Sequence, residues 1–175
     1  CVYCSATLRN SYSKRFRFRG AQSVLEELWL LRSLGCTLVH FKDDVFTLDR
    51  QRVVRLCEAM AASGLRLPWT VQTRPDLVDG ELLRLMKRAG CVTIGLGVES
   101  GSQRVLDRLG KKLDVARVPR AFALAREAGL LTVGFFMLGN PGETEEEIRQ
   151  THRLLLDIAP DIIQVAFFTA YPGAE

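Results

Sequence analysis

The chain has 175 residues, of which 47% are hydrophobic and 25% are charged, and its formal net charge is +4. This composition is typical of a folded globular domain, and it excludes disordered and collagen-like chains. The longest nearly unbroken apolar run, residues 130–139, is far shorter than the ~20 residues that a membrane-spanning helix needs. We expect no signal peptide, and the odd number of five cysteines favours a cytoplasmic location over a disulfide scaffold.

The chain begins with Cys1-Val2-Tyr3-Cys4. Two cysteines in C-x-x-C spacing can form half of a zinc site, a dithiol redox couple or two corners of an iron–sulfur cluster. Each of these sites needs further residues, so the spacing alone leaves all three open. A zinc site is disfavoured because no second Cys or His pair has ligand spacing. A thiol redox domain is disfavoured because no helix of thioredoxin type follows Cys4.

The basic cluster of the chain, residues 9–19, has the sequence RNSYSKRFRFR, in which arginines alternate with phenylalanines. Such a pattern can bind single-stranded nucleic acid through charge and stacking. It is equally typical of a short extended segment with solvated arginines and buried phenylalanines. The rest of the chain lacks the strongly basic face of a nucleic-acid-binding protein, so we favour the extended segment and expect no nucleic-acid partner.

Five short apolar runs rich in Val, Ile, Phe or Thr predict buried strands at residues 37–41, 69–73, 92–98, 131–138 and 162–168. The amphipathic stretches between them predict helices. Asp49 and Asp79 are placed as helix N-caps, and Thr144 with Glu147 forms a capping box. Glycines that suit left-handed C-caps follow four of the helices, at Gly35, Gly64, Gly90 and Gly129. The cysteines within these elements, Cys36, Cys57 and Cys91, are expected to be core thiols rather than ligands.

Strands that alternate with helices predict an α/β fold with a parallel sheet covered by helices. Five strand–helix units cannot close a standard eight-stranded barrel, so we predict an open or partial barrel. At least one strand is expected to precede Cys1. Gly95 and Gly97 within one strand predict a close backbone approach or a tight barrel interior.

In such folds the functional groups lie in loops at the C-terminal ends of the strands. Every predicted strand here ends in polar or glycine-rich residues, namely 42–44, 72–74, 99–100, 139–143 and 169–171. Asp43 and Asp44 can form an acidic pair for an amine or a metal. Glu99 ends a buried strand, where a carboxylate is costly unless it meets a ligand or a hydrogen-bonding loop. This edge of the sheet is therefore the predicted active face.

Six segments of the chain occur in a characteristic order: CVYCS, FKDDVFTLD, RPDLV followed by LLRLMKRAGC, GVESGSQRVLDRLGKK, GFFMLGNPGETEEEI and YPG. Together they resemble the radical S-adenosylmethionine superfamily across essentially the whole chain, and they are most similar to its cobalamin-associated subgroup. The resemblance implies that residues 1–175 are one core domain, a partial (β/α)6 TIM-like barrel whose first strand is missing from this chain. It also implies a C-x3-C-x2-C motif, in which Cys1 and Cys4 match the second and third cysteines.

The resemblance implies an enzyme that cleaves S-adenosylmethionine reductively with a 4Fe-4S cluster and forms a 5′-deoxyadenosyl radical. It implies a small-molecule substrate and an electron donor such as flavodoxin or ferredoxin. The subgroup implies a cobalamin-dependent methyltransferase or cyclase, with cobalamin bound by a domain outside this chain. The alternative within the superfamily is a methylthiotransferase-like enzyme acting on RNA or protein. The alternative from another class is a zinc-binding structural or interaction module.

The resemblance also assigns individual cofactor-binding residues. Tyr3 matches the aromatic residue that lies near the adenine. Asp43 and Asp44 stand where many members have Gly-Gly-Glu, and either is expected to meet the amine of the methionine moiety. No catalytic acid or base is predicted.

Further along the chain, Glu99 matches the residue that contacts the ribose hydroxyls, and Ser100 begins the helix beside it. Gly139 falls in a segment similar to the G-x-I-x-G-x-x-E motif on the adenine side, although its glycines are one residue further apart than in that motif. Val165 is expected to offer its backbone to the adenine.

Overall fold

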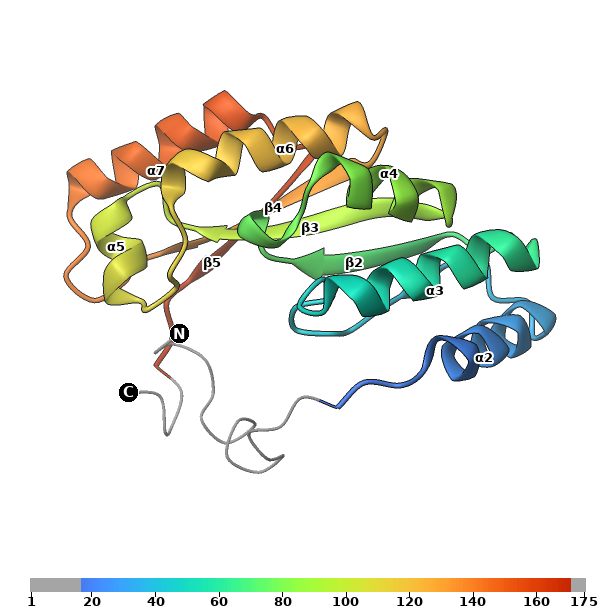
Figure 1. The fold of residues 1–175 in the computed structure, drawn as a ribbon. Coiled ribbons are helices and arrows are strands. Elements are labelled where there is room, and N and C mark those ends of the chain that lie inside the picture. The colour runs from blue at the N-terminus through green and yellow to red at the C-terminus, as the bar shows by residue number, and fades with distance from the viewer. Residues whose placement is uncertain (1–16, 171–175) are drawn as a thin grey trace.

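The structure is a computed structural model and describes residues 17–170 (Figure 1). Its five parallel strands pair in chain order and are β1 (Val39–His40), β2 (Trp69–Thr73), β3 (Cys91–Glu99), β4 (Leu131–Leu138) and β5 (Ile162–Phe167). The helices of this described range are α2 (Ala21–Ser33), α3 (Arg50–Ser63), α4 (Gly80–Arg88), α5 (Gln103–Arg108), α6 (Val118–Glu127) and α7 (Glu145–Ile158). Two 3-10 turns, η1 (Pro75–Leu77) and η2 (Val115–Arg117), complete the set.

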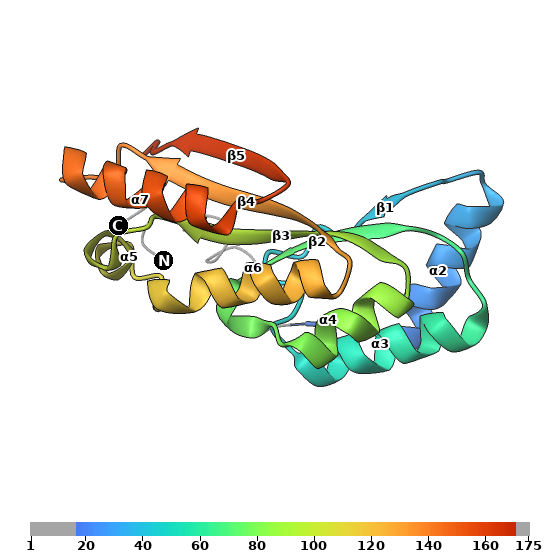
Figure 2. The same ribbon diagram turned by 90° about the horizontal axis from the view of Figure 1, so that it is seen from above.

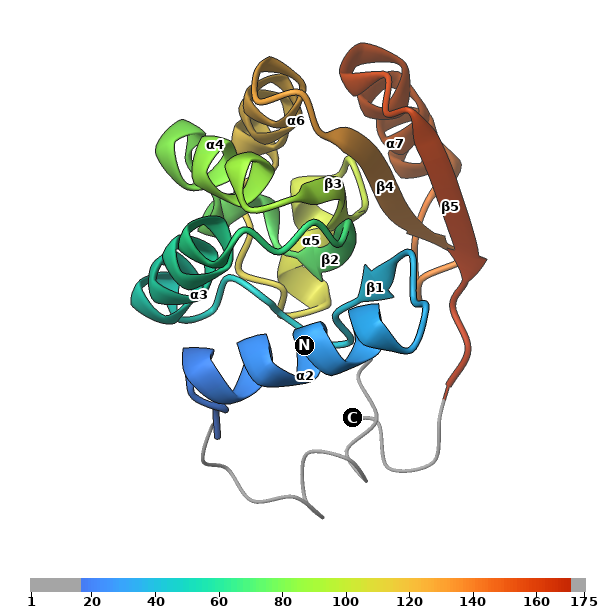
Figure 3. The same ribbon diagram turned by 90° about the vertical axis from the view of Figure 1, so that its right-hand side faces the viewer.

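The sheet curls into part of a barrel. Viewed along the strands, α3, α4, α6 and α7 lie around its outer side (Figure 3). From above, α3, α4 and α6 follow one another along that side (Figure 2). The predicted α/β partial barrel is therefore confirmed for the five strands present. The strand expected before Cys1 lies outside this chain and stays a prediction.

The predicted helix caps are confirmed. The Asp49 side chain accepts a hydrogen bond from Arg52 N at 3.0 Å, and Asp79 accepts one from Leu82 N at 2.8 Å. Thr144 and Glu147 form both hydrogen bonds of the capping box at the start of α7. Such caps contribute about 1 kcal/mol each. All four predicted C-terminal glycines have positive φ, in the order Gly35, Gly64, Gly90 and Gly129 at 88°, 72°, 97° and 76°.

The core lies between the sheet and its outer helices. Trp69 of β2 is completely buried, and its indole Nε1 donates to the Ala89 carbonyl at 2.8 Å, which satisfies the one polar atom of the side chain. Cys57 and Cys91 are also completely buried, and burial raises the pKa of both thiols to about 12. Their prediction as core thiols is confirmed, whereas Cys36 is only partly buried.

Three sequence predictions are wrong in part. The first strand is two residues long rather than five. All six residues of β5 are exposed, because β5 is the edge of the described sheet and no described helix covers it completely. Phe18 is 43% exposed rather than buried, with the guanidinium of Arg52 5.1 Å from its ring centre.

None of the helices within residues 17–170 combines the length and hydrophobicity that a membrane crossing needs.

Candidate functional site

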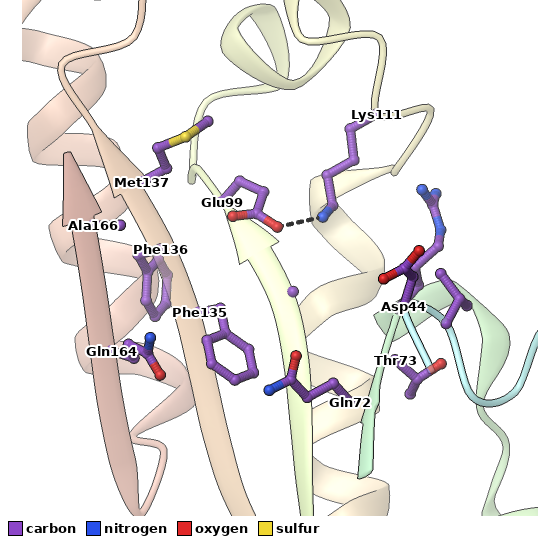
Figure 4. A pocket seen from close by; sticks show the side chains of 13 residues that line it. Asp44, Gln72, Thr73, Glu99, Lys111, Phe135, Phe136, Met137, Gln164 and Ala166 are labelled. Atoms are coloured by element: carbon purple, nitrogen blue, oxygen red, sulfur yellow. Dashed lines mark hydrogen bonds and ion pairs between the residues drawn. The ribbon is translucent and has the colours of Figure 1, made fainter. Parts of the chain in front are cut away.

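A cavity of about 440 Å³ opens on the inner side of the sheet, at the C-terminal ends of the strands (Figure 4). This is the edge where the sequence predicts the active face. A volume of this size is within the usual range for small-molecule sites. The polar residues that line the cavity come from strands β2, β3 and β5 and from the loops after β1, β2 and α5, and are Asp44, Gln72, Thr73, Arg74, Glu99, Lys111 and Gln164.

Glu99 reaches this cavity through an unusual backbone conformation. The register between β3 and β4 shifts between Gly97 and Glu99, as at a β-bulge, which redirects a side chain at the end of a strand. Glu99 has a φ of 70°, in the left-handed region that non-glycine residues seldom adopt. Such conformations persist only where the surrounding structure holds them, and they are concentrated at functional sites.

The carboxylate of Glu99 pairs with Lys111, whose Nζ lies 2.7 Å from Glu99 Oε1. Lys111 is only 4% exposed, so its charge is removed from water and is balanced by the carboxylate of Glu99. Burial lowers the pKa of Lys111, and the nearby Glu99 opposes that effect. Lys111 was not among the residues predicted from the sequence. Its only sequence signal is its place in the RLGKK stretch, because the 11 residues between Glu99 and Lys111 follow no periodic pattern.

Gly97 leaves the space that this ion pair needs. A Cβ atom at residue 97 would lie 3.0 Å from Glu99 Oε1 and 3.2 Å from Lys111 Nζ. A Cβ atom at Gly95 would lie 2.4 Å from the ring of Phe135, which forms part of the cavity wall. Of the two alternatives predicted for these glycines, these side-chain contacts fit the tight barrel interior, and both glycines keep the inner face of β3 clear.

The two neighbouring aspartates face different parts of the molecule. Asp44 lines the cavity that Glu99 lines. Asp43 lines a second cavity beside α2, and its Oδ1 lies 3.6 Å from Arg52 Nη1. The arginine is 9% exposed and also stands near the rings of Phe18 and Phe46. Of the acidic pair, Asp44 is therefore the residue that shares a cavity with Glu99.

The other predicted site residues do not line this cavity with their side chains. Ser100 is completely buried and hydrogen-bonds to Thr151 of α7. The helix that the resemblance begins at Ser100 begins later, with Ser102 as its N-cap. Gly139 follows β4 with a φ of 74° and has open space where a Cβ atom would lie. Val165 lies between Gln164 and Ala166, which line the cavity, so its side chain points to the other face of β5.

The predicted residues Cys1, Tyr3 and Cys4 lie outside the described residues. Within residues 17–170, no three His, Cys, Asp or Glu side chains are grouped so that they could hold a metal ion. The part of the chain that the structure describes therefore supplies a cavity with two carboxylates and two cations. Such a lining suits a polar ligand that has hydroxyl groups and charges of both signs.

The family model of the radical SAM superfamily matches residues 1–155. The chain is 33% identical over 176 residues to an uncharacterised methyltransferase of Pyrococcus horikoshii, covering 100% of this chain and 38% of that protein. It is 32% identical over 177 residues to the anaerobic magnesium-protoporphyrin IX monomethyl ester cyclase of Cereibacter sphaeroides, covering 98% of this chain and 28% of the cyclase. The chain thus spans well under half of either relative.

Among solved structures, the fold is similar to that of the radical S-adenosylmethionine methyltransferase TsrM from Kitasatospora setae, which was solved with cobalamin and a 4Fe-4S cluster bound. The TM-score is 0.79 at 23% sequence identity, and the match covers 85% of this chain and 29% of TsrM. At this identity the likeness shows the fold alone. It places the five strands described above within a known kind of partial barrel.

Proposed function

Because the chain belongs to the radical S-adenosylmethionine superfamily, we propose that it forms the core of an enzyme that binds a 4Fe-4S cluster and S-adenosylmethionine and acts on a small-molecule substrate. The observation that carries the proposal is the carboxylate of Glu99, held at the edge of a cavity of about 440 Å³ by Lys111 and by a left-handed backbone. The reduced cluster, when bound, supplies the electron that cleaves the sulfonium of the cofactor.

The residues of this chain have four tasks in the proposal, of which the binding of the ribose belongs to Glu99. Cys1 and Cys4, with a third cysteine from before the chain, hold the cluster, and Tyr3 lies beside the adenine. Asp44 accepts a hydrogen bond from the amine of the methionine moiety. The backbone near Gly139 and Val165 contacts the adenine.

Glu99 accepts hydrogen bonds from the ribose hydroxyls. An ionised carboxylate has about four acceptor positions, so Glu99 can accept from Lys111 and from hydroxyl groups at the same time. The pair of Glu99 with Lys111 also needs little rearrangement when a ligand binds, because its geometry is fixed before binding. The described cavity fits this role, since Gly97 keeps a side chain out of the space beside Glu99.

For the complete protein we propose a cobalamin-dependent methyltransferase or cyclase, with cobalamin held by a domain outside this chain. The names of the methyltransferase and cyclase relatives support these two kinds of reaction. Methylthiotransferases also occur among the relatives and make a methylthiotransferase acting on RNA or protein the second candidate. We propose flavodoxin or ferredoxin as the electron donor. We propose the cytoplasm as the location, because an iron that is open to a ligand is also open to oxidants.

The test uses the full-length protein, reconstituted anaerobically with iron and sulfide and given a chemical reductant. It should convert S-adenosylmethionine into methionine and 5′-deoxyadenosine. Glu99→Ala should weaken S-adenosylmethionine binding by about 10- to 100-fold, because it removes hydrogen bonds to a charged group. The cluster absorption of this variant should match that of the wild type. Equal loss of the cluster and of cofactor binding would contradict the role proposed for Glu99.

A further inference from the structure

We propose that Thr151 and Glu147 of α7 are positioning residues, which clamp the loop after β3 and so hold Glu99 in its binding conformation. The inference rests on the proposed binding of S-adenosylmethionine by Glu99. Neither residue lines the cavity, so each acts through the loop. Figure 1 shows α5, which follows this loop, beside α7 at one end of the sheet.

The backbone of Glu99 needs such support. Among the described non-glycine residues, only Glu99, Lys112 and Ala159 have positive φ. A left-handed conformation at a glutamate is unfavourable by itself, so neighbouring contacts must hold it. Lys111 holds the side chain, but the peptide that follows Glu99 is held by residues 100–102 and their contacts with α7.

Thr151 is the centre of a chain of buried hydroxyl groups. Its Oγ1 donates to the Glu147 carbonyl at 3.0 Å and accepts from the Gly101 amide at 2.9 Å. The same oxygen lies 3.1 Å from Ser100 Oγ, which itself accepts from the Ser102 amide at 3.1 Å. If Ser100 donates to Thr151, every hydroxyl proton and every loop amide in this set has a partner. One side chain of α7 thus fixes two successive residues after Glu99.

Glu147 fixes the next residue and the start of α5. Its Oε1 accepts from Ser102 Oγ at 3.0 Å and from Arg104 Nε at 2.7 Å. The Thr144 amide donates to Oε2 at 2.8 Å, so this carboxylate also belongs to the capping box of α7. Glu147 is 5% exposed, and these partners, first of all Arg104, hold its pKa far below the ordinary value. A single ionised group therefore joins the two helices.

The loop and α7 also touch through their backbones. A Cβ atom at Gly101 would lie 2.6 Å from the Gln150 carbonyl oxygen and 2.7 Å from Thr151 Cα. No side chain other than the hydrogen of glycine fits there. The loop is consequently packed directly onto α7. Loss of the Thr151 hydroxyl should therefore shift the loop backbone and, with it, Glu99.

The experiment compares Thr151→Val with Thr151→Ser in the full-length reconstituted protein. Valine keeps the shape of threonine but leaves the Gly101 amide and the Ser100 hydroxyl without their acceptor, whereas serine keeps the acceptor. Thr151→Val should raise the dissociation constant of S-adenosylmethionine about tenfold with an unchanged cluster absorption. Thr151→Ser should restore most of the affinity. Binding is measured well below the melting temperature, so that lost stability alone does not change it.

A second pair keeps the test decisive if Thr151→Val does not fold. Glu147→Gln weakens the link to Ser102 and Arg104, and Glu146→Gln is its matched control, because Glu146 lies in the same turn but forms an exposed ion pair with Arg153. Cofactor affinity should fall for Glu147→Gln and not for Glu146→Gln. Wild-type affinity in both Thr151→Val and Glu147→Gln, with lost affinity in Glu99→Ala, would overturn the inference. Wild-type affinity in Glu99→Ala would instead overturn the proposed role of Glu99.

Discussion

At the scale of single residues, the site depends on carboxylates that neighbouring positive charges or hydrogen bonds hold in place. Glu99 has Lys111 as its partner, and Asp43 has Arg52. Removing one partner of such a pair lowers the stability of the fold by more than the intact pair contributes, because the remaining charge is left without compensation. The pairing therefore separates two neighbouring aspartates: the partner of Asp43 lies away from the cavity, and Asp44 faces into it.

This separation predicts different effects for two similar variants. Asp44→Asn should weaken S-adenosylmethionine binding by about tenfold, because an amide cannot replace a carboxylate as the partner of an ammonium group. Asp43→Asn should leave binding near the wild-type value and lower thermal stability through the lost pair with Arg52. Equilibrium binding to the two reconstituted full-length variants checks this. A larger loss of affinity in Asp43→Asn than in Asp44→Asn would show that Asp43, not Asp44, contacts the amine of the cofactor.

At the scale of helices and strands, the sequence predicts most of the fold because each strand–helix unit carries its own signals. Strands β2 to β5 are continuous apolar runs, and the capping residues give helix starts at residues 50, 80 and 145. The periodicity does not predict α5, because six residues are too few to show a helical repeat. The pair of Glu99 with Lys111 could not be predicted either, since it depends on the path of the loop and α5 between them.

One link between neighbouring strands makes stability depend on pH. Asp161, just before β5, accepts from both the amide and the hydroxyl of Thr132 in β4, at 2.7 Å each. The hydrogen bond from the Thr132 amide, followed by that from its hydroxyl, lowers the pKa of Asp161 below 3.8. A lowered carboxyl pKa in the folded state contributes stability above the ordinary pKa, and this contribution is lost as the pH falls through the folded-state pKa.

Asp161→Ala should therefore lower the free energy of unfolding near pH 7 by about 1 kcal/mol or less, since Asp161 is exposed. The difference from wild type should shrink as the pH falls below about 4. Denaturant unfolding of both proteins at several pH values measures this difference. A difference that stayed constant down to pH 2 would show that the ionised carboxylate contributes nothing through Thr132.

At the scale of the whole molecule, a curled parallel sheet brings loops from distant parts of the chain to one edge. Asp44, Glu99 and Lys111 meet there although they are widely separated in sequence. The order of polar strand ends predicts that Asp44 and Glu99 meet, because parallel strands have their C-terminal ends on the same side, but it does not predict that Lys111 joins them. The side chains that share the cavity are not predicted by that order, as the different directions of Asp43 and Asp44 show.

The proposed cluster ligands can also be tested on the complete protein. A full-length protein with cysteine four residues before Cys1 should bind about four iron atoms after anaerobic reconstitution. The double variant Cys1→Ala, Cys4→Ala should lose nearly all of this iron and the visible absorption of the cluster. Cys57→Ala serves as the control, because Cys57 is completely buried in the core. Equal iron in the double variant and the wild type would refute these cysteines as ligands.

At residue 99 the left-handed backbone favours glycine, whereas the proposed binding of the cofactor requires glutamate. Glycine would relieve a conformational penalty of about 1 to 2 kcal/mol at this position, yet it would delete the carboxylate. Glycine would also leave the buried Lys111 without its carboxylate partner, so selection for heat resistance alone gains little from glycine at residue 99 and would discard the proposed ribose contact. A library screened for thermal tolerance should keep this position fixed, and gains in stability should be sought instead among exposed residues of the outer helices.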